Sequence, residues 1–217
     1  MLNPADVKDF YDRFGSRQDR QGFYEDAALE ELSAHADFRA ARAIVEFGCG
    51  TGRFAHQVLS LATDATYVGL DVSTTMVQLA RARLAPFGPR ARVDQLEAGS
   101  VHLPIGARAA DRIISTYVLD LLPATDIATF CQEARRVLSP EGRLCLISLT
   151  PGVSPLPRLV SRLWDAVFRL RPSLVGGCRP ISLSSYCDRQ LWDVEYHRTV
   201  SQWALSSEVL IVRPHAT

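Results

Sequence analysis

The pattern of apolar and polar positions divides the chain into a helical N-terminal part and a longer part where strands and helices alternate. Residues 3–41 predict two helices, because their apolar residues recur at helical spacing on either side of a polar turn at 15–22. Five short apolar runs then predict buried strands at 43–47, 66–70, 93–97, 112–116 and 144–149. Amphipathic stretches between these runs predict helices, one of them with Ser73 as its N-cap.

The C-terminal part has a different pattern. Two β-rich runs at 192–200 and 204–212 are separated by a tight turn and predict an antiparallel hairpin. A short helix is expected just before the hairpin, over 184–191. Strand–helix units closed by such a hairpin predict an α/β fold whose sheet is parallel except near its end.

Residues 151–180, between the fifth strand and the hairpin, are more than this fold requires. They include an amphipathic helical pattern in which Leu156, Leu159 and Leu163 lie opposite Arg158 and Arg162. We interpret this insert and the N-terminal helices as a cap over the carboxyl ends of the strands, where ligands of open α/β sheets bind. Two alternatives stay open: the helix packs on the sheet as a core element, or it lies on a membrane surface.

Three alternate glycines, Gly48, Gly50 and Gly52, directly follow the first strand and precede a helix. Such a turn presents backbone N–H groups at a helix N-terminus, with no Cβ to block a nucleotide ligand. A dinucleotide site prefers glycine or alanine where Arg53 stands. Glu46 would also repel a pyrophosphate but could receive an ammonium group.

Asp71 ends the second strand about twenty residues after the glycines, the distance at which a carboxylate accepts the ribose hydroxyls of a bound nucleotide. Because NAD-binding units share this feature, Asp71 predicts a ribose and no particular cofactor. A ligand with a ribose for Asp71, an amino-acid cation for Glu46 and no phosphate fits both carboxylates. S-adenosylmethionine is such a ligand.

The run Glu46-Phe47-Gly48-Cys49-Gly50-Thr51-Gly52 resembles the first motif of class I S-adenosylmethionine-dependent methyltransferases, E/D-x-G-x-G-x-G, at every fixed position. The resemblance covers 43–212 and is greatest to the type that includes ubiquinone and menaquinone C-methyltransferases and phospholipid N-methyltransferases. It implies a Rossmann-like, seven-stranded sheet with an antiparallel last strand. The expected single domain, 1–217, comprises a helical cap at 1–41, a cofactor-binding core at 42–150, the insert at 151–180, and a last helix with the hairpin at 181–217.

The resemblance also implies which residues form the site. Residues expected to contact S-adenosylmethionine are Tyr11, Glu46, Gly48, Cys49, Gly50, Thr51, Gly52, Arg53, Asp71, Val72, Met76, Gly99, Ser100, Val101, Thr116 and Tyr117. Asp120, Tyr117 and Tyr11 are the expected catalytic residues. Asp120 stands where many relatives have histidine. The alternative to a catalytic role is that Asp120 is a carboxylate at the start of a helix, where backbone N–H groups satisfy it. Ser100 stands where relatives often carry the acid that binds adenine.

Composition narrows the range of partners. Lys+Arg and Asp+Glu balance at 24 each, so no global field attracts nucleic acid or an anionic membrane. The Asn/Asp-Pro-Pro-aromatic run of DNA-base methyltransferases is absent after the fourth strand. Five cysteines without metal-ligand spacing predict no metal site and a reduced, cytoplasmic location. We expect at most peripheral membrane contact, and the oligomeric state stays open.

The sequence therefore predicts methyl transfer from S-adenosylmethionine to a small, fairly apolar acceptor, a metabolite or a quinone-like or lipid-like molecule, beneath the cap. Alignment and desolvation supply most of the rate of such a displacement. Two alternatives remain: a non-catalytic protein that binds S-adenosylmethionine, and an NAD-dependent oxidoreductase, against which Arg53 and the hairpin count.

Overall fold

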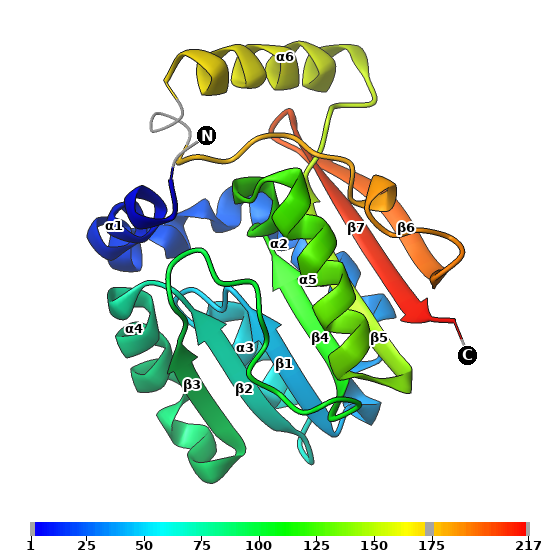
Figure 1. Cartoon of the computed structure of the whole chain (residues 1–217). Helices are drawn as coiled ribbons and strands as arrows, with labels where there is room; N and C mark the ends of the chain where they lie inside the picture. Colours follow the sequence, from blue (N-terminus) through cyan, green and yellow to red (C-terminus); the bar gives the residue numbers. More distant parts are fainter. Residues whose placement is uncertain (1–2, 172–175, 216–217) are drawn as a thin grey trace.

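The computed structural model describes residues 3–171 and 176–215, which surround one seven-stranded sheet (Figure 1). The strands are β1 Ala43–Phe47, β2 Thr66–Asp71, β3 Ala91–Gln95, β4 Ala110–Thr116, β5 Leu138–Leu149, β6 Trp192–Gln202 and β7 Leu205–Pro214. Their order is β3-β2-β1-β4-β5-β7-β6. Strand β7 runs in the direction opposite to the other six strands. The expected Rossmann-like sheet with an antiparallel last strand is confirmed.

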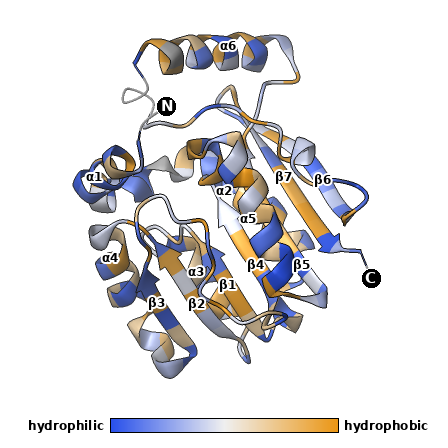
Figure 2. Ribbon diagram, viewed as in Figure 1, coloured by the Kyte–Doolittle hydropathy of each residue, from blue (hydrophilic) through white to orange (hydrophobic). Residues whose placement is uncertain are grey.

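Helices cover both faces of the sheet, and apolar strands lie between them (Figure 2). The α-helices are α1 Pro4–Phe14, α2 Gly22–His35, α3 Arg53–Leu61, α4 Thr74–Leu84, α5 Ala124–Val137 and α6 Pro155–Leu170. The 3-10 helices are η1 Gly15–Gln21, η2 Phe38–Ala40, η3 Ala85–Arg90, η4 Leu119–Leu121 and η6 Leu183–Ser185. Side chains alternate across β1, so Ile44 packs with α2, α3 and α4, whereas Val45 packs with α5.

Some local expectations are confirmed, but several strand boundaries differ from the expected ones, that of β5 most of all. Ser73 caps α4, since its hydroxyl accepts the Met76 N–H at 3.1 Å. β5 begins at Leu138, six residues before the predicted start, because Leu138 already pairs with Ala110 of β4 across a register shift. The polar residues 139–142 that follow α5 lie in this irregular stretch, and regular pairing with β4 resumes at Arg143.

The short helix expected at 184–191 is wrong, because only the 3-10 turn η6 forms there. The backbone N–H groups of Leu183 and Ser184 donate to the buried carboxylate of Glu208, at 2.7 and 3.1 Å. Later N–H groups bond carbonyls three or four residues back in isolated turns. Tertiary hydrogen bonds thus replace the short helix that was expected before the hairpin.

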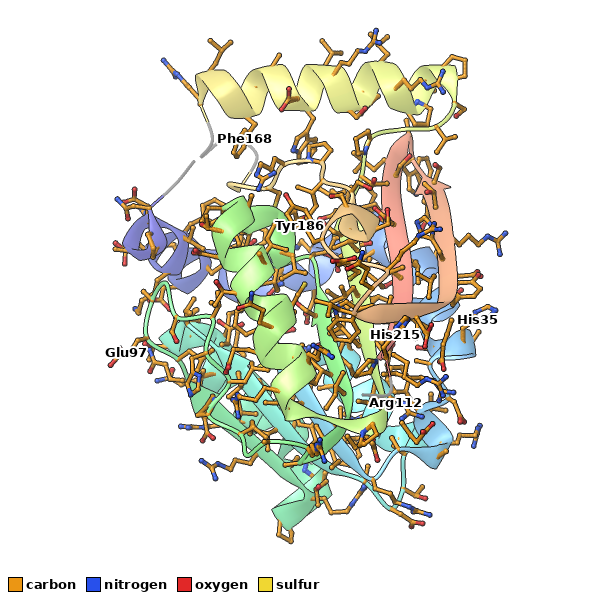
Figure 3. The ribbon with its side chains drawn as sticks, turned by 45° about the vertical axis from the view of Figure 1, so that its right-hand side comes forward. His35, Glu97, Arg112, Phe168, Tyr186 and His215 are labelled. Atoms are coloured by element: carbon orange, nitrogen blue, oxygen red, sulfur yellow. The ribbon has the colours of Figure 1, made fainter. Side chains whose placement is uncertain are left out.

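Helix α6 forms an outer layer above the carboxyl ends of the strands (Figure 1). It contacts the body through one side: Trp164 donates its Nε1–H to the Cys178 carbonyl at 2.9 Å, and Phe168, only 9% exposed, points down from the helix (Figure 3). Two hydrophobic core clusters flank the sheet, and no described residue of α6 belongs to either of them. Residues 172–175 of the expected insert lie outside the described residues. None of the described helices combines the length and apolarity needed to cross a membrane.

Candidate functional site

The turn between β1 and α3 depends on left-handed glycines. Gly48, Gly50 and Gly52 have φ of 76°, 53° and 74°. The Gly48 N–H donates to the Leu70 carbonyl of β2 at 2.7 Å, and a Cβ on Gly48 would lie 2.2 Å from the Val118 side chain. The turn therefore needs glycine both for its backbone and for its close approach to the segment after β4.

Asp71 fastens this turn to the end of β2. Its carboxylate is 9% exposed and accepts the N–H groups of Gly50 at 2.9 Å and Ser73 at 2.8 Å. Burial raises the pKa of Asp71 to about 6, although both hydrogen bonds oppose the rise. A carboxylate offers about four lone-pair sites, so two remain for a ligand's hydroxyl groups.

A cavity of about 180 Å³ lies beside the turn and Asp71. It draws its walls from α1, from the carboxyl ends of β1, β2 and β4, and from the loop after β3. The expected site residues that line it are Tyr11, Gly48, Gly50, Asp71, Val72, Met76, Gly99, Ser100, Thr116 and Tyr117. The structure thus brings residues from six separate segments to one cavity.

Sequence reasoning missed the other lining residues, which are mostly apolar. They are Pro4, Val7, Gln18, Phe47, Leu70, Leu96, Val118, Leu121, Leu122, Pro123 and Asp126. Helical spacing from Tyr11 back to Val7 and Pro4 was a usable signal, because these positions share one face of α1. The residues around η4 gave no signal, since so short a 3-10 helix has no readable period.

Other expected residues lie away from this cavity. Glu46, Cys49, Thr51 and Arg53 line a smaller adjoining cavity of about 40 Å³. The two cavities share Gln18, Gly48, Thr116 and Tyr117 as common walls. Gly52, Val101 and Asp120 line neither cavity.

Gly52 and Val101 have packing roles in the structure. A Cβ on Gly52 would lie 3.1 Å from the Cα of Ala80, so glycine lets α3 approach α4 closely. Val101 packs against the core cluster on the α5 face of the sheet.

Glu46 is buried behind the glycine turn. Its Oε2 accepts the Tyr67 hydroxyl at 2.6 Å, and the Tyr67 ring reaches it across Gly69, where a Cβ would lie 2.8 Å from that hydroxyl. Burial, and secondarily the charge of Asp71, raise the pKa of Glu46 to about 8 despite this hydrogen bond. Glu46 is therefore mostly protonated at neutral pH when the adjoining cavity holds no cation.

Arg53 faces α2. Its guanidinium donates to Glu25 at 3.0 Å and to Asp26 at 2.5 Å, which ties the start of α3 to α2. Burial raises the pKa of Glu25 to about 7, and Arg53 opposes that rise. This pairing could not be predicted, because residues 28 positions apart share no local periodicity.

Asp120 lies in η4 beneath the cavity wall and is fully buried. Its Oδ2 accepts the Leu149 N–H at 3.3 Å, and its Oδ1 has no hydrogen-bond partner among the described residues. Burial raises the pKa of Asp120 to about 7, and the charge of Arg179 opposes the rise. Arg179, in the segment after α6, donates its backbone N–H to the Asp120 carbonyl at 3.2 Å.

Tyr11 and Tyr117 place hydroxyl groups in this region. Burial raises the pKa of Tyr11, and the charges of Cys178 and Asp120 raise it further. Tyr117 has a left-handed φ of 58°, an uncommon conformation for a residue with a Cβ, and its hydroxyl lies 2.9 Å from Ser207 Oγ. Its ring meets that of Tyr24 edge to face at 5.8 Å.

The N-terminal segment is fastened over the glycine turn. Asp19 of η1 accepts the Thr51 hydroxyl and an Arg83 N–H, each at 2.6 Å, and the Gln18 side chain rests against Gly50. The sequence predicted only a polar turn over 15–22, because the partners of these polar side chains lie more than thirty residues away.

Helix α1 is fastened in the same way. Asp12 accepts the Ser73 hydroxyl at 2.6 Å and the Thr75 N–H at 3.1 Å, both at the start of α4. Burial alone would raise the pKa of Asp12, but hydrogen bonds from Lys8 and Ser73 outweigh it and lower the pKa to about 2. The Asp12 carboxylate that holds α1 against α4 therefore keeps its charge at neutral pH.

The sheet order, the single reversed strand and the glycine turn define the Rossmann-like methyltransferase architecture. Among family models, one described as "Methyltransferase domain" matches residues 44–142. Trans-aconitate 2-methyltransferase of Methylobacterium radiotolerans is 32% identical over 216 residues, which is 93% of this chain and 75% of that protein. The chain therefore belongs to the class I S-adenosylmethionine-dependent methyltransferases, and the oxidoreductase alternative is wrong.

Further similarities are more local or more distant. The ubiquinone/menaquinone biosynthesis C-methyltransferase UbiE of Syntrophotalea carbinolica is 30% identical over 130 residues, 60% of this chain and 52% of that protein. The chain spans about half the length of the first relatives it matches. Geranyl diphosphate C-methyltransferase of Streptomyces coelicolor A3(2) has the same fold, with a TM-score of 0.67 at 13% identity over 87% of this chain and 79% of that one.

Proposed function

We propose that the protein transfers a methyl group from S-adenosylmethionine to a small, fairly apolar acceptor. One observation carries this proposal: a single cavity contains Asp71 and the glycine turn on some of its walls and a largely apolar set of side chains on the others. Val7, Leu121 and Leu122 belong to the apolar set. Such a mixed lining suits a polar nucleoside beside an apolar partner.

The residues present suit S-adenosylmethionine, which supplies a methyl group already activated on a sulfonium. Asp71 would accept the ribose hydroxyls through its remaining lone pairs, and Val72 and Met76 would flank the adenine, with Gly99 and Ser100 completing that slot. The left-handed glycines leave the turn open to the methionine portion.

The adjoining cavity would take the amino-acid end of the cofactor. Glu46 would receive the ammonium group, and a cation beside it would favour its charged form and lower its pKa. Cys49, Thr51 and Arg53 share this cavity, although Arg53 is already paired with α2. Their contribution would be shape and backbone polarity.

The acceptor would lie against Tyr11, Thr116 and Tyr117, beneath α1. These side chains would exclude water and align the acceptor, which is where most of the acceleration of methyl transfer arises. Asp120 lines neither cavity, so we assign it a positioning role: its carboxylate accepts the Leu149 N–H and its carbonyl accepts the Arg179 N–H, which ties η4 to β5 and to the segment after α6. The helical insert would complete the cap through the segment around Arg179.

The test begins with titration of S-adenosylmethionine into the purified protein by calorimetry. Asp71→Asn should weaken binding about 10- to 100-fold, because a hydrogen bond to a charged group contributes roughly 1.5–3 kcal/mol. Asp64→Asn, at an exposed position 70% accessible, is the matched control and should bind normally.

The second arm incubates protein and a cell extract with cofactor carrying a deuterated methyl group. Mass spectrometry should find a labelled apolar product with the wild type and little with Asp71→Asn. Absence of cofactor binding would refute the proposal. Binding without any labelled product or S-adenosylhomocysteine would favour the non-catalytic alternative.

A further inference from the structure

Large apolar side chains stand exposed in a row along α6. Leu156 is 62% exposed, Leu159 55%, Leu163 58% and Leu170 83%. Their spacing of three, four and seven residues puts them on one stripe of the helix, to which Val167 also belongs. This apolar row is defined by Leu156, Leu159, Leu163, Val167 and Leu170.

The row does not face the rest of the protein. Pro157, Trp164 and Phe168 make the side of α6 that meets the body, and Pro157 and Phe168 are buried. Helix geometry rotates the apolar row from that side by roughly a third of a turn. Since α6 is an outer layer (Figure 1), the row meets solvent along the length of the helix.

The helix also concentrates positive charge. Residues 151–171 hold arginines at 158, 162, 169 and 171 and one aspartate at 165, a net charge of 4 − 1 = +3 in a chain whose total is zero. The remainder of the chain is therefore −3. Within the described ranges, Arg158 and Arg162 make no side-chain hydrogen bond or ion pair, so their guanidinium groups are available.

We propose that α6 docks on an anionic lipid bilayer, with the apolar row in the interfacial region and Arg158 and Arg162 at the lipid phosphates. A helix with one apolar stripe and a basic flank lies in the membrane plane in this way. A second copy of the chain complements the row less well, because stacking two α6 helices would bring together two segments of charge +3. Membrane docking thus uses both the apolarity and the charge of the helix.

Hydrogen bonds link α6 to η4, the 3-10 helix beside the cavity. Trp164 donates to the Cys178 carbonyl, and the next residue, Arg179, donates its backbone N–H to the Asp120 carbonyl. An apolar acceptor dissolved in the bilayer would therefore meet the protein on the side of its site. Docking stands independently of catalysis, whereas this supply of acceptor rests on the proposed function.

The experiment is flotation of the full chain with vesicles of phosphatidylcholine alone and with vesicles of phosphatidylglycerol and phosphatidylcholine in equal parts. Binding should occur to the anionic vesicles and should weaken as salt is added. Arg158→Glu/Arg162→Glu should weaken it about 30-fold or more, since each arginine near an anionic surface contributes about fivefold. Arg39→Glu/Arg189→Glu makes the same charge change at two exposed positions outside α6 and should bind as the wild type.

The apolar row has its own variant and control. Leu159→Ser/Leu163→Ser should weaken vesicle binding about tenfold or more, because each leucine loses apolar area that would be buried in the interface. Leu191→Ser/Val194→Ser changes two exposed apolar residues outside α6 and should leave binding intact. Both pairs of substitutions lie on the surface, and the circular dichroism spectra of the two variants should match that of the wild type.

Failure to float with either vesicle, or equal binding by wild type and both α6 variants, would overturn the docking proposal. A dimer in sedimentation that Leu159→Ser/Leu163→Ser converts to monomer, without any vesicle binding, would overturn it in favour of self-association. Calorimetry with S-adenosylmethionine on the same preparations separates the two proposals. Intact cofactor binding without flotation rejects the docking alone, and flotation without cofactor binding rejects the proposed function alone.

Discussion

The buried carboxyl group of Glu46 gives the protein a pH-dependent stability that one isosteric substitution should remove. Its pKa is raised from 4.5 to about 8, mainly by burial, so the folded state holds a proton that the unfolded chain releases. The extra stability is present below pH 4.5 and is lost as the pH rises toward 8. Each pH unit between these values changes the unfolding free energy by about 1.4 kcal/mol, so the interval from pH 5 to 8 corresponds to about 4 kcal/mol.

Glu46→Gln keeps the shape of the side chain and an oxygen that can accept the Tyr67 hydroxyl, but it cannot ionise. Urea denaturation of wild type and variant from pH 5 to pH 9 should give unfolding free energies that diverge by about 4 kcal/mol, with the variant more stable at high pH. Glu30→Gln, at an exposed position of α2, should follow the wild type. Parallel curves for wild type and Glu46→Gln would refute the reasoning.

Gly48→Ala should lower the unfolding free energy by more than about 2 kcal/mol, because its Cβ would lie 2.2 Å from Val118. Gly88→Ala, at φ of 57° and ψ of −137° but in open space, should lose less stability, because it adds about 1–3 kcal/mol of backbone strain and no clash; equal losses in denaturation would contradict this explanation. Arg53→Met should cost about 3 kcal/mol at pH 8, where it leaves Glu25 buried and charged, and less at pH 5, where Glu25 binds a proton. Calorimetry on Arg53→Met should find cofactor affinity nearly unchanged, and a large loss would place Arg53 in the cofactor site.

The sheet could be predicted because its signals are local. The buried runs that became β1 and β2 and the hairpin that became β6 and β7 each show their period within a few residues. Asp71 could be placed because its distance from the glycine turn is fixed by the length of one helix and one strand. Each of these predictions depended only on residues that lie close together in the chain.

Roles that depend on distant partners could not be predicted. Arg53 directly follows the glycine motif, yet its guanidinium is paired with Glu25 on α2. Asp120 follows the fourth strand as expected, but the 3-10 helix η4 turns its carboxyl beneath the cavity wall. In both cases the backbone was foreseeable, whereas the side-chain direction was set by partners far along the chain: α2 for Arg53, and β5 and the segment after α6 for Asp120.

The bonds of Asp12 and Asp19 have a consequence for turnover. They hold α1 and η1, which form part of the cavity wall, against α4 and the glycine turn. Each such hydrogen bond to a charged group contributes roughly 1.5–3 kcal/mol, so the segment detaches only transiently. On the proposed function, release of the spent cofactor would require that detachment, so the N-terminal segment would help to set the interval between successive reactions.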